Sequence, residues 1–249
     1  MIGFFRKIRR KLADDNQFFK YSRYAIGEIV LVVVGILIAL QINNWNNNRI
    51  GHLNEKVLLS YIIEDLRYDH EILIELIEQA QSKQSLHEKL YNESIAEFIS
   101  TRNEPFSSEI LELIFLLSKT WDNHQDAVEE ISEKDLRSDL NKYFSDYNVT
   151  NNYVEIHNEA VIELRQYFRQ YELLNLNVIF NSNPNKQSFD PNTLIHTDKF
   201  RALLGTKEFN SLLVELYLGN QDVIQWLETL SKRNEFLRSK LTEYLDQNK

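Results

Sequence analysis

Six histidines are the first residues to test for chemistry, because the imidazole ring serves both as a metal ligand and as a general base. They are His52, His70, His87, His124, His157 and His196. None follows a Glu at three residues, as in the Glu-x-x-His of di-iron helical proteins, and no pair has the spacing of His-Glu-x-x-His. The chain has no cysteine, which excludes thiolate zinc sites, cysteine nucleophiles and disulfides. The sequence therefore predicts no metal and no cofactor.

Asp65, Asp69 and His70 form the best local cluster of possible ligands. Asp65 and Asp69 are four residues apart and share a helix face, where a weak cation contact is conceivable. In so acidic a chain a solvated acidic face is much the commoner arrangement, and it is the one expected here. No Gly-rich phosphate loop and no Gly-x-Ser-x-Gly elbow occurs, so the sequence predicts no enzyme unless a site is assembled across helices.

Glu28 is the most unusual charged residue, because it lies near the start of the apolar stretch 25–42. One interpretation places it at a membrane edge, where it reaches the interface and pairs with Lys20 or Arg23. The alternative is a carboxylate in a helix-helix contact, used in docking or in ion or proton coupling. Gly27, Gly35 and Ala39 support the alternative, since they lie on one stripe beside Glu28 and Gly35-x-x-x-Ala39 permits close helix approach.

The apolar stretch itself predicts a transmembrane helix, assigned to residues 25–45. Its 18 residues would span about 27 Å as a helix, close to the thickness of the hydrocarbon layer. Tyr24 and Trp45 lie where aromatic residues anchor a helix at the two interfaces. A cleaved signal peptide is the nearest competitor, but the long lead and the lack of a small-x-small cleavage pattern favour a span that stays attached.

Charge asymmetry predicts the orientation of this span. Residues 1–24 carry seven basic and two acidic side chains, whereas the chain after Glu28 has 21 basic and 34 acidic residues, a net charge of −13. By the positive-inside rule the amino end is cytoplasmic, and residues 46–249 form a periplasmic domain on a bacterial inner membrane. The acidic balance also disfavours nucleic-acid binding. Five residues of the basic segment are expected to contact the bilayer surface, together with Tyr24 and Trp45: Arg6, Lys7, Arg9, Arg10 and Lys11.

Helices are expected throughout, because the chain has only six Gly and three Pro. The span is expected to continue through the asparagines at 43–48 as one rod and to end near Tyr91. Further helices are predicted from a Ser108 cap to about Lys119, from Asp122 to about Leu174 with a break near Ser132 and fraying at 148–152, over 198–204, and from Lys207 to Asp246 with a possible interruption at Gly219. Loops are expected at 101–107 and 181–192.

These helices predict an all-α fold, in which the transmembrane helix is continuous with a long helix of an antiparallel helical bundle. The carboxyl-terminal half is rich in aromatic residues, which are expected to be core, a ligand groove between helices being the minority interpretation. They are Tyr143, Phe144, Tyr147, Tyr153, Tyr167, Phe168 and Tyr171.

Two segments carry a family resemblance. "FFRKIRRKL" followed by "YAIGEIVLVVVGILIALQINNWN" is similar to the amino-terminal signature of an uncharacterised single-span membrane protein family of Bacteroidota, a domain of unknown function. Farther on, "QDAVEEISEKDLRSDLNKYFSDY" resembles the second region of that family. The resemblance implies an anchored helical protein and implies no activity.

Two functional hypotheses remain open from the sequence. The first is a membrane-anchored, non-enzymatic helical module that binds a protein partner or senses a ligand, with possible self-association through the transmembrane helix. The second is a subunit of a membrane complex in which Glu28 takes part in ion or proton coupling or in helix docking.

Overall fold

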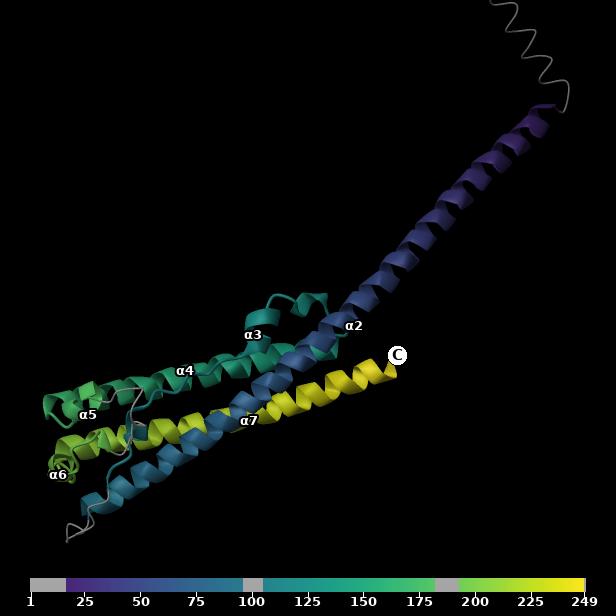
Figure 1. Ribbon diagram of the computed structural model, residues 1–249. Helices are drawn as coiled ribbons and strands as arrows, with labels where there is room; N and C mark the ends of the chain where they lie inside the picture. The colour runs from purple at the N-terminus through teal and green to yellow at the C-terminus, as the bar shows by residue number, and fades with distance from the viewer. Residues whose placement is uncertain (1–16, 96–104, 182–192, 249) are drawn as a thin grey trace, which may run out of the picture. The chain divides into compact units, whose positions relative to one another are not determined.

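The chain folds almost entirely into helices, as a computed structural model shows for residues 17–95, 105–181 and 193–248 (Figure 1). The helices are α2 (Gln17–Ile95), α3 (Lys119–His124), α4 (Lys134–Gln170), α5 (Leu176–Asn181), α6 (Thr197–Arg201) and α7 (Lys207–Gln247), with 3-10 turns η1 (Ser108–Leu111) and η2 (Val128–Glu130). Within these ranges there is no β-strand, and Leu174 and Ile195 form one isolated bridge. The prediction of an all-helical protein is confirmed.

Helix α2 contains the apolar stretch and continues beyond it without interruption. It is helical over 79 residues, so the asparagines at 43–48 do not end it. This confirms the predicted continuity, and the helix ends at Ile95 rather than near Tyr91. The chain nevertheless divides into two compact units, Met1–Val57 and Leu58–Lys249, with the boundary inside α2.

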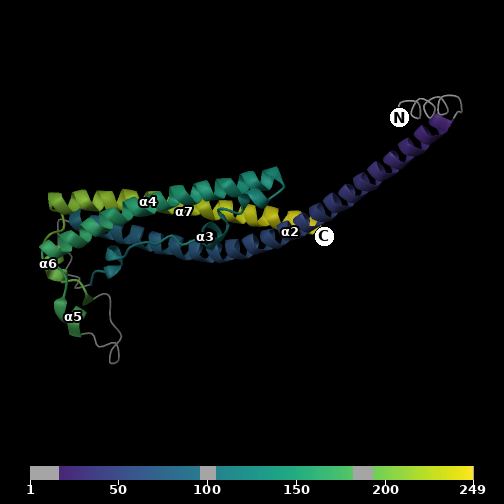
Figure 2. The ribbon, with the colours of Figure 1, turned by 90° about the horizontal axis from the view of Figure 1, so that it is seen from above.

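The unit Leu58–Lys249 is built on three long helical segments, and its buried apolar residues form two core clusters, the first of which all three segments share. Leu66 and Leu73 of α2, Leu140 of α4 and Leu227 and Leu237 of α7 all belong to this first cluster and are buried. Helices α4 and α7 pack against each other: they run alongside in Figure 1 and cross in projection in Figure 2. Burial of these leucine faces is the main stabilisation of the unit.

Hydrogen bonds fix the directions of the three segments. Asn234 of α7 donates to the carbonyl of Leu66, and Asn220 donates to that of Ala80, so α7 runs antiparallel to α2. The ion pairs of α7 with α4, Arg233 with Asp146 and Lys240 with Asp139, likewise show an antiparallel pair. It follows that α2 and α4 are parallel. The expected antiparallel arrangement therefore holds for α7 but is wrong for the α2 and α4 pair.

Two parallel neighbours need a connection that returns along their length, and residues 105–133 supply most of it. The predicted helix from a Ser108 cap to Lys119 is wrong. Ser107 caps only the short turn η1, residues 112–117 are extended, and Ser118 caps α3. In 114–117 buried and exposed residues alternate, which is the period of an extended chain and not of a helix. The run is apolar at every position, so its period could not be read from the sequence.

Helices α4 and α7 are more continuous than predicted. The break near Ser132 is real, but Glu133, not Ser132, accepts the capping hydrogen bond from the N–H of Asp135. No fraying occurs at 148–152, because Thr150 is buried against α7, and tertiary packing outweighs weak helix propensity there. Helix α7 is also unbroken at Gly219, where a Cβ would lie 3.5 Å from Nδ1 of His157.

Two positions with positive φ generate a stability prediction. Glu172 (φ 51°) follows the end of α4, where glycine is the usual residue, and Leu173 donates its N–H to Phe168 in the matching C-terminal motif. Glu172→Gly should raise the free energy of unfolding by about 1 kcal/mol, because it removes Cβ strain from a left-handed backbone. Urea unfolding checks the change.

Gly205 (φ 80°) gives the matched control. Gly205→Ala should lower the free energy of unfolding, because the backbone is left-handed and an added Cβ would lie 3.0 Å from the carbonyl oxygen of Ser94. Shifts of the same sign in the two variants would contradict the assignment of strain to Glu172.

Candidate functional site

The apolar stretch of α2 packs against no other described residue of its own unit. Every residue from 25 to 42 is exposed, and a Cβ built on Gly27 or Gly35 would meet no atom within 4 Å. Among the described residues this is the one helix long and apolar enough to cross a membrane. The stripe predicted from Gly27, Gly35 and Ala39 therefore lies exposed on one helix, and no second helix among the described residues of the unit packs against it.

Glu28 lies in this exposed stretch without a hydrogen bond or ion pair to any residue that the structure describes. The predicted pairing with Lys20 or Arg23 involves side chains outside the described set. Tyr24 and Trp45 are exposed on the same helix, about 32 Å apart by helical rise, and the guanidinium carbon of Arg49 lies 5.9 Å from the centroid of the Trp45 ring. The five basic residues expected at the bilayer surface, Arg6, Lys7, Arg9, Arg10 and Lys11, lie outside the described residues.

The Asp69 carboxylate of α2 accepts four hydrogen bonds from other segments of the unit Leu58–Lys249. Its Oδ2 accepts hydrogen bonds from the Ser118 hydroxyl (2.6 Å), the N–H of Thr120 (3.1 Å) and the Tyr143 hydroxyl (3.1 Å), and its Oδ1 accepts one from the N–H of Lys119 (2.7 Å). The residue is only 1% exposed. The expectation of a solvated acidic face is therefore wrong for Asp69, whose carboxylate binds the first turn of α3.

The other members of the predicted local cluster point elsewhere. Asp65 accepts a hydrogen bond from Asn123 and contacts Nε2 of His124 at 2.9 Å, whereas His70 lies 3.6 Å from a carboxylate oxygen of Glu235. The fold thus separates Asp65, Asp69 and His70 into three different contacts. No group of three or more metal-ligating side chains is found in the parts of the chain that the structure describes.

A second buried polar group was missed by sequence reasoning. Lys83 and His87 of α2, His157 of α4 and Asn220 of α7 are all essentially inaccessible. Asn220 donates to the carbonyl of Ala80 (2.8 Å) and to the Gln84 side chain (2.9 Å), and Lys83 donates to the carbonyl of Glu112. Both ring nitrogens of His157 and Nδ1 of His87 have no hydrogen-bond partner in the described structure. The only sequence signal for this group is that each of its polar residues occupies a helix position that faces the core.

Burial sets the protonation states of this group. Desolvation lowers the pKa of His87 to about 4 and that of His157 to about 3, and the nearby positive charge of Lys83 adds to both effects. Desolvation also lowers the pKa of Lys83 to about 8, opposed by Glu112 and Glu109 and reinforced by Arg165. Both histidines are therefore neutral in the folded chain at pH 7.

The aromatic residues of the carboxyl-terminal half belong to the core, as expected, and do not line a ligand groove. Tyr143, Phe144, Tyr147, Tyr167 and Phe168 are buried. Tyr153 and Tyr171 are partly buried and pack against the two core clusters. Trp121 stacks on Tyr147 at 5.2 Å between centroids, and Trp226 stacks on Tyr153 at 5.6 Å. The hydroxyl of Tyr143 has a raised pKa, because it is buried beside the Asp69 carboxylate.

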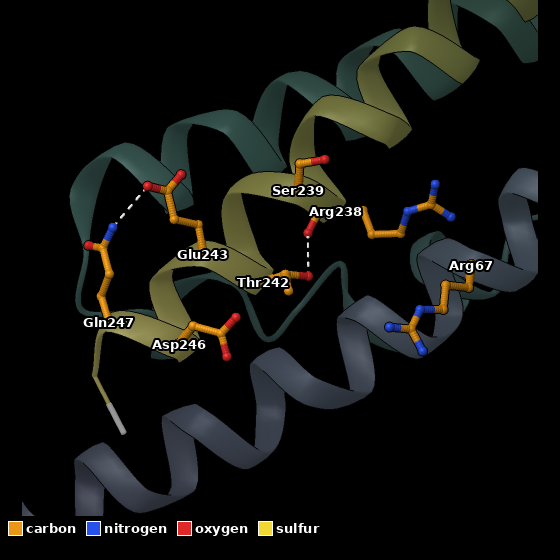
Figure 3. A pocket seen from close by; sticks show the side chains of 7 residues that line it. All are labelled: Arg67, Arg238, Ser239, Thr242, Glu243, Asp246 and Gln247. Atoms are coloured by element: carbon orange, nitrogen blue, oxygen red, sulfur yellow. Dashed lines mark hydrogen bonds between the residues drawn. The ribbon is translucent and has the colours of Figure 1, made fainter.

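A surface hollow of about 620 Å³ lies between α2 and the end of α7 (Figure 3). Arg67 and Arg238 line it with Glu243 and Asp246, so its charges balance. Thr242 donates to the carbonyl of Arg238, and Gln247 donates to Glu243. The hollow is wide open to solvent and gathers no buried polar group, so it lacks the convergent polar groups that mark a ligand site.

Comparison with known proteins supplies a family match without an activity. A family of unknown function (DUF6090) matches residues 28–101, from Glu28 in the apolar stretch to beyond the end of α2. No curated protein and no solved structure matches the chain. The expected likeness to a family of unknown function is thus confirmed over residues 28–101.

Asp69 gives a stability prediction. Asp69→Asn should lower the free energy of unfolding by about 3 kcal/mol, because an amide offers one acceptor oxygen to four buried donors. Urea unfolding followed by tryptophan fluorescence checks it. Asp65→Asn is the control and should cost less, since Asp65 accepts from fewer donors; equal losses would contradict the central role of Asp69.

The buried histidines generate a pH prediction. Both pKa values are lower in the folded chain than the value of about 6.5 expected after unfolding, so the unfolded chain binds more protons below pH 6.5. The free energy of unfolding should therefore fall between pH 6.5 and about 4, by about 2 kcal/mol per histidine at pH 5. Urea midpoints at pH 7.5 and pH 5 measure this.

His157→Gln should remove about half of that acid destabilisation. The matched control is Gln81→Asn on the exposed face of α2, which removes no titratable group and should leave the acid response unchanged. An acid response in His157→Gln equal to that of the natural chain would contradict a lowered pKa for His157.

Proposed function

We propose that the protein is a single-pass, membrane-anchored helical module of the bacterial inner membrane, whose unit Leu58–Lys249 lies in the periplasm and binds a protein partner or senses a ligand. The single observation that carries this proposal is the apolar stretch 25–42, in which no residue is buried. A continuous apolar surface of that length in water marks a surface that another apolar phase covers.

Energetics favour lipid as that phase. The stretch contains Ile, Val and Leu at most positions, and transfer of each such side chain from water contributes about 2 kcal/mol. An α-helix satisfies its own backbone hydrogen bonds, so it can enter lipid without leaving polar groups unpaired. Glu28 lies near one end of the stretch, where a charged group costs least.

Charge supports the orientation. The basic residues before Tyr24 favour retention of the amino end in the cytoplasm, and the unit after the span carries the acidic excess. This topology implies three kinds of partner: the bilayer, another protein, and a second copy of the span. It does not favour nucleic acid as a partner.

The structure favours binding over catalysis, because the Asp65 and Asp69 carboxylates are already engaged in hydrogen bonds that hold the fold. Asp69 accepts four hydrogen bonds that hold α3, and Asp65 contacts Asn123 and His124. Carboxylates engaged in this way are not free to act as bases on a substrate.

Glu28 supports a second candidate, a subunit of a membrane complex that uses this carboxylate in ion or proton coupling or in helix docking. The supporting observation is that Glu28 is exposed on an apolar helix with no partner in the described chain. Glu28→Gln should then abolish the phenotype of the natural chain while leaving membrane insertion intact. An unchanged phenotype removes this candidate.

The topology is tested with single cysteines, since the chain has none of its own. In spheroplasts, Ser239→Cys should react with a membrane-impermeant maleimide, whereas Ala13→Cys should react only after lysis. Labelling of Ser239→Cys only after lysis would overturn the proposed topology.

Insertion is tested by charge. Leu31→Arg and Leu37→Arg should each make insertion about 3 kcal/mol less favourable and release the chain from alkali-washed membranes. Leu53→Arg is the control, since Leu53 (52% exposed) matches Leu37 (54%) but lies beyond the span, and it should remain membrane-bound.

A further inference from the structure

Beyond the apolar stretch, helix α2 carries exposed apolar side chains on a single face. Between residues 43 and 57 most side chains are polar. The large apolar ones in this range, apart from Trp45, are Ile50, Leu53 and Val57. They are 45%, 52% and 51% exposed. Because three and four residues separate them, they lie along one face of the helix.

Lipid does not reach the end of this face in the proposed placement. Trp45 marks the outer interface, and Val57 lies twelve residues beyond it, about 18 Å along the helix. An apolar face on an otherwise polar helix in water marks a contact with another protein surface. A protein, and not the bilayer, therefore covers the outer part of this face.

The same face continues back through the apolar stretch as a seven-residue repeat. In coiled-coil notation Ile50 and Val57 occupy a positions and Leu53 occupies a d position. The full set of a positions is Ile29, Ile36, Asn43, Ile50 and Val57, and the d positions are Val32, Ala39, Asn46 and Leu53. Inside the stretch 25–42 almost every other position is apolar as well, so the segment 43–57 defines the repeat.

The repeat ends where the unit Met1–Val57 ends. The next d and a positions, Ser60 and Glu64, are polar. The buried apolar residues of α2 begin at Leu59, which follows Val57 by two residues and thus by about 200° around the helix. The face of α2 that belongs to the core is therefore not the face that carries the repeat.

We propose that two copies of this chain pair through the repeat, as a parallel two-stranded coiled coil of α2 over residues 29–57. β-Branched residues at a, with Leu at d, favour two strands, and every a position here except Asn43 is Ile or Val. A polar Asn at a single a position specifies register and oligomeric state. Asn43 has this function in the pair.

The anchor and the asparagines select a second copy as the occupant. On the proposed membrane placement, upon which this step rests, every copy inserts in the same direction, so identical residues lie at the same depth. Asn43 then faces Asn43, and each amide can both donate to and accept from the other. Asn46, at the next d position, meets its own counterpart in the same way. A different protein would need the same repeat with asparagines at the same depth.

Charge favours the parallel direction. In a parallel pair the g positions of one helix face the e positions of the other, so the basic g residues Arg49 and Lys56 approach the neutral e residues Asn47 and Asn54. Antiparallel pairing would bring the g residues of the two copies together, with like charges opposite. The guanidinium carbon of Arg49 lies 5.9 Å from the centroid of the Trp45 ring, which keeps this charge on the flank of the helix.

The first test is disulfide crosslinking of the full chain in membranes, which the absence of native cysteine permits. Leu53→Cys should form a linked dimer on mild oxidation, because facing d residues lie within disulfide range. Asn48→Cys is the control, since Asn48 is also exposed but occupies an f position on the far side of the helix. The yield for Leu53→Cys should exceed that of the control about tenfold, from the high effective concentration in a pair.

Two outcomes of this experiment would refute the proposal. Equal yields for Leu53→Cys and Asn48→Cys would show that the repeat does not face a second helix. A linked species in which a different protein replaces the second copy would assign the face to another partner. Co-expression of tagged and untagged chains identifies the species, because a pair of copies gives the mixed dimer.

A charge variant separates association from anchoring. Leu53→Arg places two guanidinium groups opposite each other in the pair, so it should abolish the dimer in detergent micelles, measured by light scattering. Asn48→Arg adds the same charge at the f position and should leave the dimer unchanged. Leu53→Arg should still remain in alkali-washed membranes. A dimer that persists in Leu53→Arg would overturn the pairing.

The register is tested at the asparagine. Asn43→Ile should admit species larger than the dimer, because the a-position amide no longer specifies two strands. Asn44→Ile adds the same side chain at a b position and should stay dimeric. An Asn43→Ile chain that forms only dimers would contradict the position of Asn43 in the pair. Since association in micelles does not depend on the side of the membrane on which residues 46–249 lie, the pairing and the proposed topology can fail separately.

Discussion

The hydrogen bonds of the Asp69 carboxylate hold the connection that the fold requires. Since α2 and α4 are parallel, the chain must return along their length before α4 can begin. The Asp69 carboxylate fixes the end of this returning segment. It accepts hydrogen bonds from the Ser118 hydroxyl and from two backbone N–H groups at the start of α3. A carboxylate at a helix N-terminus is favoured by the orientation of the helix dipole, and burial strengthens each of these bonds. The position of the segment 112–117 depends on this anchor at one end and on η1 at the other.

Polar residues in the core specify how the long helices align. Asn220 and Asn234 donate to carbonyls of α2 four turns apart along that helix, at Ala80 and Leu66, so a shift of α7 by one turn would break both bonds. Leucine faces alone would tolerate such a shift at modest cost. His87 and His157 lie in the core without complete hydrogen bonding, and desolvation by burial lowers their pKa values and that of Lys83. Buried asparagines thus align the long helices, and buried histidines make the fold sensitive to acid.

The two units differ in the way their apolar residues are used. In Leu58–Lys249 the leucines, valines and aromatics are turned toward one another, and the exposed surface is acidic. In Met1–Val57 the stretch 25–42 exposes all its side chains. The proposed membrane anchor followed by a folded unit would account for both patterns.

Much of this protein was determined by local sequence patterns. The shortage of Gly and Pro and the three- and four-residue spacing of apolar side chains specify long helices, because both act within a few residues of chain. The apolar stretch and its basic flank are likewise local, as is the continuity of α2 through the asparagines. Only the tertiary structure decided that residues 112–117 are extended, because Asn158, Lys83 and Tyr147 satisfy its backbone from helices far away in sequence. It also decided that Asp69 is buried and that Gly219 lies within a helix, since both depend on which residues of distant segments meet.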